Sequence, residues 1–292
     1  MSSVSVEQAV QLATPPVDAN VPRAMTNSYA LENAPPPRSS ADNKDQKQPA
    51  MEEDLTGFWA AFTGAQVLGV LVVILVAIWT SSMGGGFAWS STPSLEFNWH
   101  PLLMSVGFIF LYGNSIMIYR GLRDMRKQRL KLIHAGLPIL TLVCVIIAQI
   151  AVFDSHNLAV PPIPNLYSLH SWIGLGAIIL YCTQWVMGLV VFLYPGASMA
   201  IRARIMSWHV FMGLTIFTLV ILASLTGLTE KAIFKLGPKY GSLPSEAYMI
   251  NFIGVSIVLF AATVVYITTN PKSKMIKAIL GFNGKNPMRH LF

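Results

Sequence analysis

Residues 100–119 read HPLLMSVGFIFLYGNSIMIY, a histidine followed by a run without a charged side chain. A run of about 20 such residues is long enough for a helix to cross the hydrocarbon layer of a membrane. His134, His170 and His209 stand in the same way at the start of long apolar runs. Because an ionisable group inside a bilayer is costly, four histidines at membrane depth indicate functional sites.

The composition of the whole chain is typical of a protein that crosses the membrane several times. Of its 292 residues, 53% are hydrophobic and only 11% are charged, and the mean hydropathy is +0.54; an ordinary soluble domain is less apolar. Cys144 and Cys182 lie inside apolar runs, which favours small core residues over a disulfide, a metal site or a redox motif. The net charge of +7 comes from basic residues at the ends of apolar segments, so it indicates membrane topology and no nucleic-acid partner.

The hydropathy pattern predicts an all-α membrane protein with six transmembrane helices. The expected spans are 57–80, 99–120, 132–153, 168–194, 206–229 and 247–269. Stretches rich in glycine or proline, such as 84–86, separate them. Residues 1–50 are rich in Pro, Ser, Asn and Ala without an apolar period, so we expect a disordered tail there. The six-helix membrane domain is therefore placed at 51–275 and a cytosolic C-terminal tail at 276–292.

The distribution of Lys and Arg predicts the orientation in the membrane. The two tails and the second and fourth loops would share one side and hold 17 of the 20 basic residues, whereas the first and third loops hold none. Cytosolic segments carry an excess of Lys and Arg. We therefore expect both termini in the cytosol, with His100 and His170 toward the outer face and His134 and His209 toward the cytosolic face.

These depths sort the four histidines into two pairs, each drawn from alternate helices of a four-helix core. Imidazole is an axial ligand of haem iron, and two protein ligands leave no open position for oxygen, so electron transfer is the expected chemistry. One macrocycle cannot span an apolar layer of ~30 Å, whereas two stacked along the membrane normal bring one near each surface. The pairs His100–His170 and His134–His209 thus predict two haems and a transmembrane electron path.

Other interpretations of the histidines are compatible with the sequence. A membrane histidine can simply bond to a backbone carbonyl, and imidazole also suits zinc or copper, so a haem-free, histidine-lined metal or proton transporter is the main alternative. Two sites of only two histidines, without carboxylates or thiolates beside them, would make a poor metal cage. A pairing of His156 with His170 on one helix face is rejected because the proline-rich stretch 161–164 would break that helix.

Seven short motifs closely resemble the cytochrome b561 family of ascorbate-dependent transmembrane reductases. They are EFNWHPLLM (96–104), YRGLR (119–123), KLIHAG (131–136), VFDSH (152–156), LYSLHSWIG (166–174), FLYPGAS (192–198) and LTGLTEK (225–231). The resemblance covers roughly 57–275, and the combination of LYSLHSW with FNWHP is highly specific. It implies six helices, two b-type haems and the same four histidine ligands.

The resemblance also implies a reaction and its partners. The donor would be cytosolic ascorbate, and the acceptor on the other side would be monodehydroascorbate or a ferric chelate. A homodimer surrounded by membrane lipid is implied as well. Both acceptors stay open, as do the plasma membrane, secretory vesicles, endosomes and lysosomes as locations.

Six basic residues lie within 12 positions at the predicted cytosolic mouth, between the second and third helices. As a group they are typical of a topology signal that also contacts anionic lipid. Ascorbate is a monoanion at neutral pH and haem carries propionates, so some of these cations should have direct partners. By resemblance, Lys127, Lys131 and Arg202 are ascorbate-binding positions, and Arg120 and Lys274 are haem contacts.

At the predicted outer mouth, the residues before His170 resemble a haem-contacting run of the family. They are Asn165, Leu166, Tyr167 and Ser168. Free backbone N–H groups at a helix start suit a propionate, and Ser168 is equally suited to cap the helix. Glu230, at the outer end of the fifth helix, matches another haem-proximal position. His156, expected in the outer loop, resembles an acceptor-side position, where an imidazole can bind an anion or take part in proton movement; a solvent-facing loop histidine is the alternative.

Overall fold

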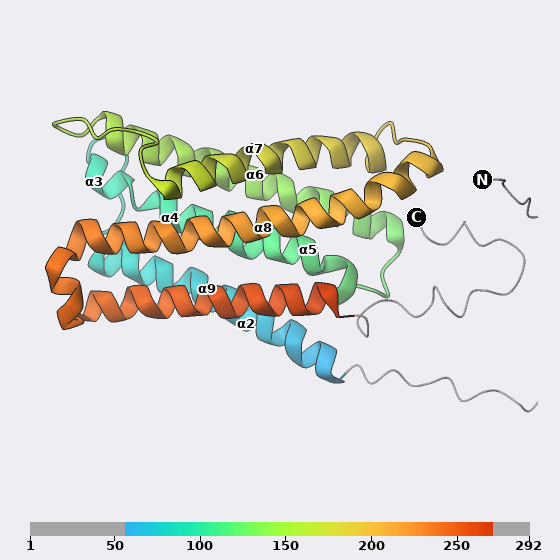
Figure 1. Ribbon diagram of the computed structural model, residues 1–292, viewed down its shortest axis with the longest axis horizontal. Helices are drawn as coiled ribbons and strands as arrows, with labels where there is room; N and C mark the ends of the chain where they lie inside the picture. Colours follow the sequence, from blue (N-terminus) through green and yellow to red (C-terminus); the bar gives the residue numbers. More distant parts are fainter. Residues whose placement is uncertain (1–55, 271–292) are drawn as a thin grey trace, which may run out of the picture. The chain divides into compact units, whose positions relative to one another are not determined.

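The computed structural model describes residues 56–270, which form a bundle of long helices (Figure 1). Six helical segments are long and apolar enough to cross a membrane, as predicted. In chain order they are α2 (Thr56–Ile78) with the π-helical turn η2 (Trp79–Met83); α4 (Trp99–Met104), η3 (Ser105–Leu111) and α5 (Tyr112–Gly121) in succession; α6 (Lys127–Asn157); α7 (Leu169–Gly188) with η4 (Leu189–Leu193); α8 (Met199–Leu236); and α9 (Ser245–Thr269). The predicted tails 1–50 and 276–292 lie outside the described residues.

Four of the six spans form the core that carries the histidines. The α4–η3–α5 span packs against α6, and α7 packs along α8. Helices α2 and α9 pack against each other beside this core, and α9 also contacts α5 and α8. Figure 1 shows α6 and α7 at one edge of the bundle and α2 and α9 at the other.

Several helices extend beyond the predicted spans. Helix α6 covers Lys127–Asn157 where the sequence predicts 132–153, and α8 covers Met199–Leu236 where it predicts 206–229. Hydropathy marks only the apolar middle of a helix, whereas backbone hydrogen bonds continue through Lys, Arg and Gln, which are good helix formers. One consequence concerns His156: it lies in the last turn of α6, so its placement in a loop was wrong.

Glycine and proline mark most of the breaks between spans. Gly85 and Gly86 have φ angles of 87° and 94° after η2, a backbone conformation that favours glycine. Pro138 is different, because it lies inside α6. Because proline has no backbone N–H, Pro138 cannot donate a hydrogen bond to the carbonyl oxygen of His134, four residues earlier. The hydroxyl of Ser115 on α5 donates to this carbonyl over 3.5 Å.

Buried aromatic rings fill the middle of the core. The rings of Tyr112 on α5 and Tyr181 on α7 meet edge to face with centroids 4.9 Å apart, and Phe108 lies 5.0 Å from Tyr181. Both tyrosine hydroxyls donate to backbone carbonyls, that of Tyr112 to α8 over 2.8 Å and that of Tyr181 to α6 over 3.1 Å. These three residues, which we call the ring layer, are at most 5% exposed, so the layer keeps water out of the middle of the bundle.

Candidate functional site

The structure brings His100 of α4 next to His170 of α7, with ring centroids 6.1 Å apart and ring planes at 89°. Nδ1 of His100 lies 3.2 Å from the carbonyl oxygen of Ala148 on α6, and Nδ1 of His170 lies 2.7 Å from that of Ala223 on α8. A hydrogen bond from Nδ1–H to a carbonyl fixes the tautomer and leaves the lone pair of Nε2 available to a metal. All four helices of the core thus contribute to this first pair.

The second pair joins His134 of α6 to His209 of α8, with centroids 6.0 Å apart and planes at 72°. Nδ1 of His134 lies 2.9 Å from the carbonyl oxygen of Ser115. Nδ1 of His209 is buried and has no hydrogen-bond partner among residues 56–270. The orientation of that ring is therefore set by packing, which includes an edge-to-face contact with Phe192 at 5.3 Å.

Two glycines allow the rings of His170 and His209 to pack closely between α7 and α8. A Cβ atom at Gly227 of α8 would lie 2.8 Å from Nδ1 of His170, and one at Gly188 of α7 would lie 3.2 Å from Cε1 of His209. The arrangement is reciprocal, since each helix carries one of these histidines and the glycine that faces the other one. Along α7, Tyr181 lies between His170 and Gly188, so the ring layer lies between the two pairs.

The spacing of both pairs fits two imidazoles on opposite faces of one haem iron. An imidazole nitrogen binds a metal at about 2 Å, and the ring centroid lies about 1 Å behind that nitrogen, so two such ligands place their centroids roughly 6 Å apart. The observed separations are 6.1 and 6.0 Å. Across the described part of the chain, no three His, Cys, Asp or Glu side chains gather as a metal cage would need. The residues present therefore fit an iron centre held by one histidine pair.

A cavity of about 460 Å³ adjoins the first pair between α7 and α8. Its lining includes His170 and three of the residues that the sequence predicts as haem contacts: Tyr167, Ser168 and Glu230. Ser168 also caps α7, because its hydroxyl accepts a hydrogen bond from the backbone N–H of Ser171 over 3.2 Å. The capping role suggested by the sequence is thus confirmed, and it leaves the haem contact of Ser168 a prediction.

The loop before α7 connects the predicted haem-contacting run to His156. Nδ1 of His156 lies 3.1 Å from Oδ1 of Asn165, whose amide group donates to Asn157 over 2.8 Å. Leu166 has a φ angle of 55°, and its carbonyl oxygen accepts a hydrogen bond from the indole of Trp172 over 2.9 Å. The side chains of Leu166 and Tyr167 are exposed.

Three of the predicted anion-binding cations gather where α6 and α8 begin. Lys131 lies within electrostatic reach of both Lys127 and Arg202. Arg202 is held in place by a 2.7 Å hydrogen bond from its Nε to the carbonyl of Ala197. We call Lys127, Lys131 and Arg202 the cation cluster. Three positive side chains drawn together would repel one another, so the cluster is suited to an anionic ligand.

The other predicted cations lie elsewhere. Arg120 donates from its guanidinium to the carbonyl of Thr268 on α9 over 2.9 Å. That contact accounts for part of its hydrogen-bonding capacity, and the proposed propionate contact stays a prediction. Lys274 lies outside the described residues.

Several residues near the two histidine pairs were not singled out as site residues from the sequence. Three of the histidine rings contact backbone carbonyls, which carry no side-chain chemistry, so no residue type could reveal these partners. Glu96, four residues before His100, is 0% exposed, and neither carboxylate oxygen has a hydrogen-bond partner among residues 56–270. Lys231 lies with its ammonium group 3.8 Å from the ring centroid of Phe97. A charged residue next to a motif histidine was the available signal for Glu96.

Six apolar helices around a core with two histidine pairs, separated by a ring layer, define a polytopic membrane protein suited to haem-linked electron transfer. Residues 99–235, which include all four histidines, match the family model of eukaryotic cytochrome b561. The chain is 44% identical over 225 residues to the plasma membrane ascorbate-dependent reductase CYBRD1 of Xenopus laevis, covering 76% of this chain and 78% of that protein. It is 41% identical over 212 residues to the transmembrane ascorbate-dependent reductase CYB561 of Sus scrofa, covering 73% and 82%.

The chain belongs to the cytochrome b561 family. This confirms the resemblance carried by the sequence motifs and makes the protein a member of a haem-binding family of membrane proteins. The alternative of a haem-free transporter finds no support in these comparisons.

Proposed function

We propose that the protein is a transmembrane oxidoreductase that moves electrons from cytosolic ascorbate, through two b-type haems, to an acceptor on the other side. The two histidine pairs carry this proposal, because each is spaced for one iron and the ring layer sets them at different depths of one core. The relatives named ascorbate-dependent reductases support ascorbate as the donor.

Each histidine would bind iron through Nε2. Haem held by two histidines would supply a reversible one-electron couple and would offer oxygen no open position. The chain fixes three of the four ligand rings through carbonyl hydrogen bonds from neighbouring helices, and glycine contacts limit the position of the rings on α7 and α8. The haem contacts expected at Arg120, Glu230 and the run Asn165–Ser168 belong to this proposal.

The cation cluster would bind ascorbate beside the second pair. Ascorbate arrives as a monoanion, loses one electron and one proton, and leaves as the monodehydroascorbate radical anion. Charge-assisted hydrogen bonds from Lys127, Lys131 and Arg202 would hold both anions, with the strength typical of ionised donors. Lys131 is nearest in sequence to His134, so it is the cation we expect to affect electron entry most.

The end of the bundle that carries His100 and His170 would receive the acceptor. The acceptor gains one electron there: a ferric chelate becomes ferrous, or monodehydroascorbate becomes ascorbate after taking up a proton. His156, held by Asn165, is the candidate docking and proton-handling group. Positive-inside bias supports this orientation, with both termini cytosolic. The protein would act as a homodimer within the lipid of the plasma membrane or an endomembrane.

Sealed vesicles test the proposal. The full chain is reconstituted with ascorbate trapped inside and either ferric chelate or enzymatically generated monodehydroascorbate outside. We expect reduction of an external acceptor only when ascorbate is inside and the wild-type chain is present. His134→Ala and His209→Ala should each remove one haem and stop this reduction. If both variants kept two haems per chain, the pairing would be wrong; if the wild type carried haem and passed no electrons, the transmembrane path would be wrong.

A further inference from the structure

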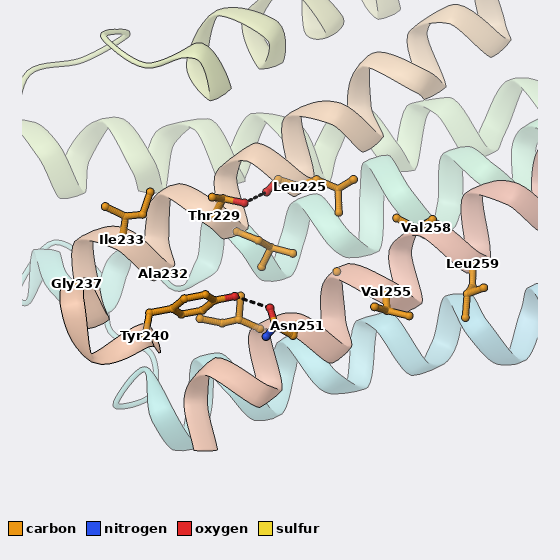
Figure 2. A pocket seen from close by; sticks show the side chains of 13 residues that line it. Leu225, Thr229, Ala232, Ile233, Gly237, Tyr240, Asn251, Val255, Val258 and Leu259 are labelled. Atoms are coloured by element: carbon orange, nitrogen blue, oxygen red, sulfur yellow. Dashed lines mark hydrogen bonds between the residues drawn. The ribbon is translucent and has the colours of Figure 1, made fainter. Parts of the chain in front are cut away.

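An apolar groove opens between α8 and α9 (Figure 2). It is separate from the cavity beside His170 but shares part of its lining with that cavity. Its volume is about 480 Å³, within the range of small-molecule sites. Leu225, Ala232 and Ile233 line it from α8, and Gly254, Val255 and Val258 line it from α9. The electron path described above uses none of these residues.

The groove lies on an exposed apolar face of the two helices. Ile233, Val255 and Val258 are 62%, 58% and 47% exposed, whereas Ala232 at the base is 3% exposed. Both helices are long and apolar enough to span a membrane, so we expect this face to meet lipid. The occupant must therefore come from the membrane and must be largely apolar.

One end of the groove is polar, and its chemistry selects the occupant. Figure 2 shows Tyr240, in the turn η5 (Gly237–Ser242), with its hydroxyl donating to Oδ1 of Asn251 on α9. This bond leaves the amide hydrogens of Asn251 to donate and the phenolic oxygen of Tyr240 to accept. A ligand hydroxyl both accepts and donates, so it can satisfy both groups, whereas a carbonyl oxygen can satisfy only the amide. No charged residue lines the groove, so a charged headgroup would find no counter-charge there.

The floor of the groove favours a rigid ligand. Ala232 presents only a methyl group to it and Gly254 has no side chain, and a Cβ atom at Gly254 would meet only Leu225, at 3.8 Å. A flat, rigid body can lie against such a surface with little loss of conformational entropy, whereas a flexible acyl chain would have to be ordered. We propose that the groove binds a membrane sterol, with its hydroxyl at Tyr240 and Asn251 and its ring system along the small-residue floor.

The sterol would share a wall with the haem region. Leu225, Thr229 and Ile233 line both the groove and the cavity beside His170. An occupant of the groove would therefore restrict the motion of the residues that enclose His170. Sterol binding can be measured without electron transfer, so its test is independent of the electron-transfer proposal.

Photolabelling of the haem-loaded full chain tests the site. The protein is placed in phosphatidylcholine nanodiscs with a photoreactive cholesterol analogue, and labelled peptides are mapped by mass spectrometry with and without excess cholesterol. We expect labelling of α8 and α9 that cholesterol displaces. Gly254→Leu should abolish it by filling the groove, and Asn251→Leu should reduce it about fivefold by removing one hydrogen bond. Gly64→Leu on α2 is the matched control, because a Cβ atom there meets nothing within 4 Å.

Several outcomes would overturn the proposal. Labelling that excess cholesterol does not displace would indicate non-specific lipid contact. Equal displacement by diacylglycerol would contradict selection of a rigid body. A disulfide between two copies of a Val258→Cys variant would show that a second chain covers the groove. The visible haem spectrum of each variant confirms folding, and if Gly254→Leu fails to fold, undiminished labelling of Asn251→Leu refutes the site.

Discussion

Replacing Gly227 with alanine should damage the first histidine pair while leaving the bundle folded. The added carbon would lie 2.8 Å from Nδ1 of His170, and carbon contacts are ordinarily about 3.5–4.0 Å, so the ring must retreat by roughly 1 Å. That retreat breaks the 2.7 Å hydrogen bond to Ala223, at a cost of about 1–3 kcal/mol. Alanine in a helix interior is favoured over glycine by about 1 kcal/mol, which offsets part of this cost.

The damage is therefore concentrated on the ligand ring. A displacement of roughly 1 Å is a large fraction of an iron–nitrogen bond length of about 2 Å, so the displaced ring could no longer bind the iron. We expect haem content, measured as the pyridine haemochrome, to fall from two to one per chain, with loss of one low-spin ferric signal in electron paramagnetic resonance. Gly64→Ala is the control, since its Cβ atom would meet nothing within 4 Å. Two haems with unchanged signals in Gly227→Ala would refute the argument.

Three further substitutions test other parts of the structure. Gly188→Ala places a carbon 3.2 Å from His209, a milder conflict, so we expect both haems to be retained with one low-spin signal shifted; an unchanged spectrum would contradict this. Lys131→Ala should slow reduction by ascorbate about tenfold or more in stopped flow, because one charge-assisted hydrogen bond is lost. Reduction by dithionite should be unchanged. Ascorbate kinetics equal to those of the wild type would make Lys131 a topology charge only. Lys235→Met removes the 2.6 Å salt bridge to Glu246, a partly exposed pair worth about 1 kcal/mol or less, so the thermal midpoint should fall slightly at constant haem content; an unchanged midpoint would show that the bridge contributes nothing.

The number of spans was predictable because bilayer thickness sets the length of an apolar run. Their ends were not, since the polar residues at both ends of α6 continue the helix outside the apolar window. For the same reason His156 was expected in a loop. The position of Pro138 inside α6 was not anticipated either. The carbonyl that this proline leaves without its helical partner accepts a hydrogen bond from Ser115 of a neighbouring helix, a contact that sequence spacing cannot show.

The pairing of the histidines was predictable because their residue type and their position along the spans carry the signal. The groups that orient them were not: the carbonyls of Ala148 and Ala223 have no residue-specific chemistry. Gly188 and Gly227 offered a partial signal, since a glycine inside a helical pattern often marks close packing. The ring that each glycine faces became evident only from the fold.

Helix α8 links the two histidine pairs mechanically. It carries His209, and through Ala223 and Gly227 it also holds His170 of the adjacent helix. With 38 residues it is about 57 Å long, so a small tilt moves its two ends by comparable amounts in opposite directions. Sliding or tilting this single segment would change the ring spacing of both histidine pairs in concert. Separate adjustment of either pair has to come from α4 or α6, which carry the opposing histidines.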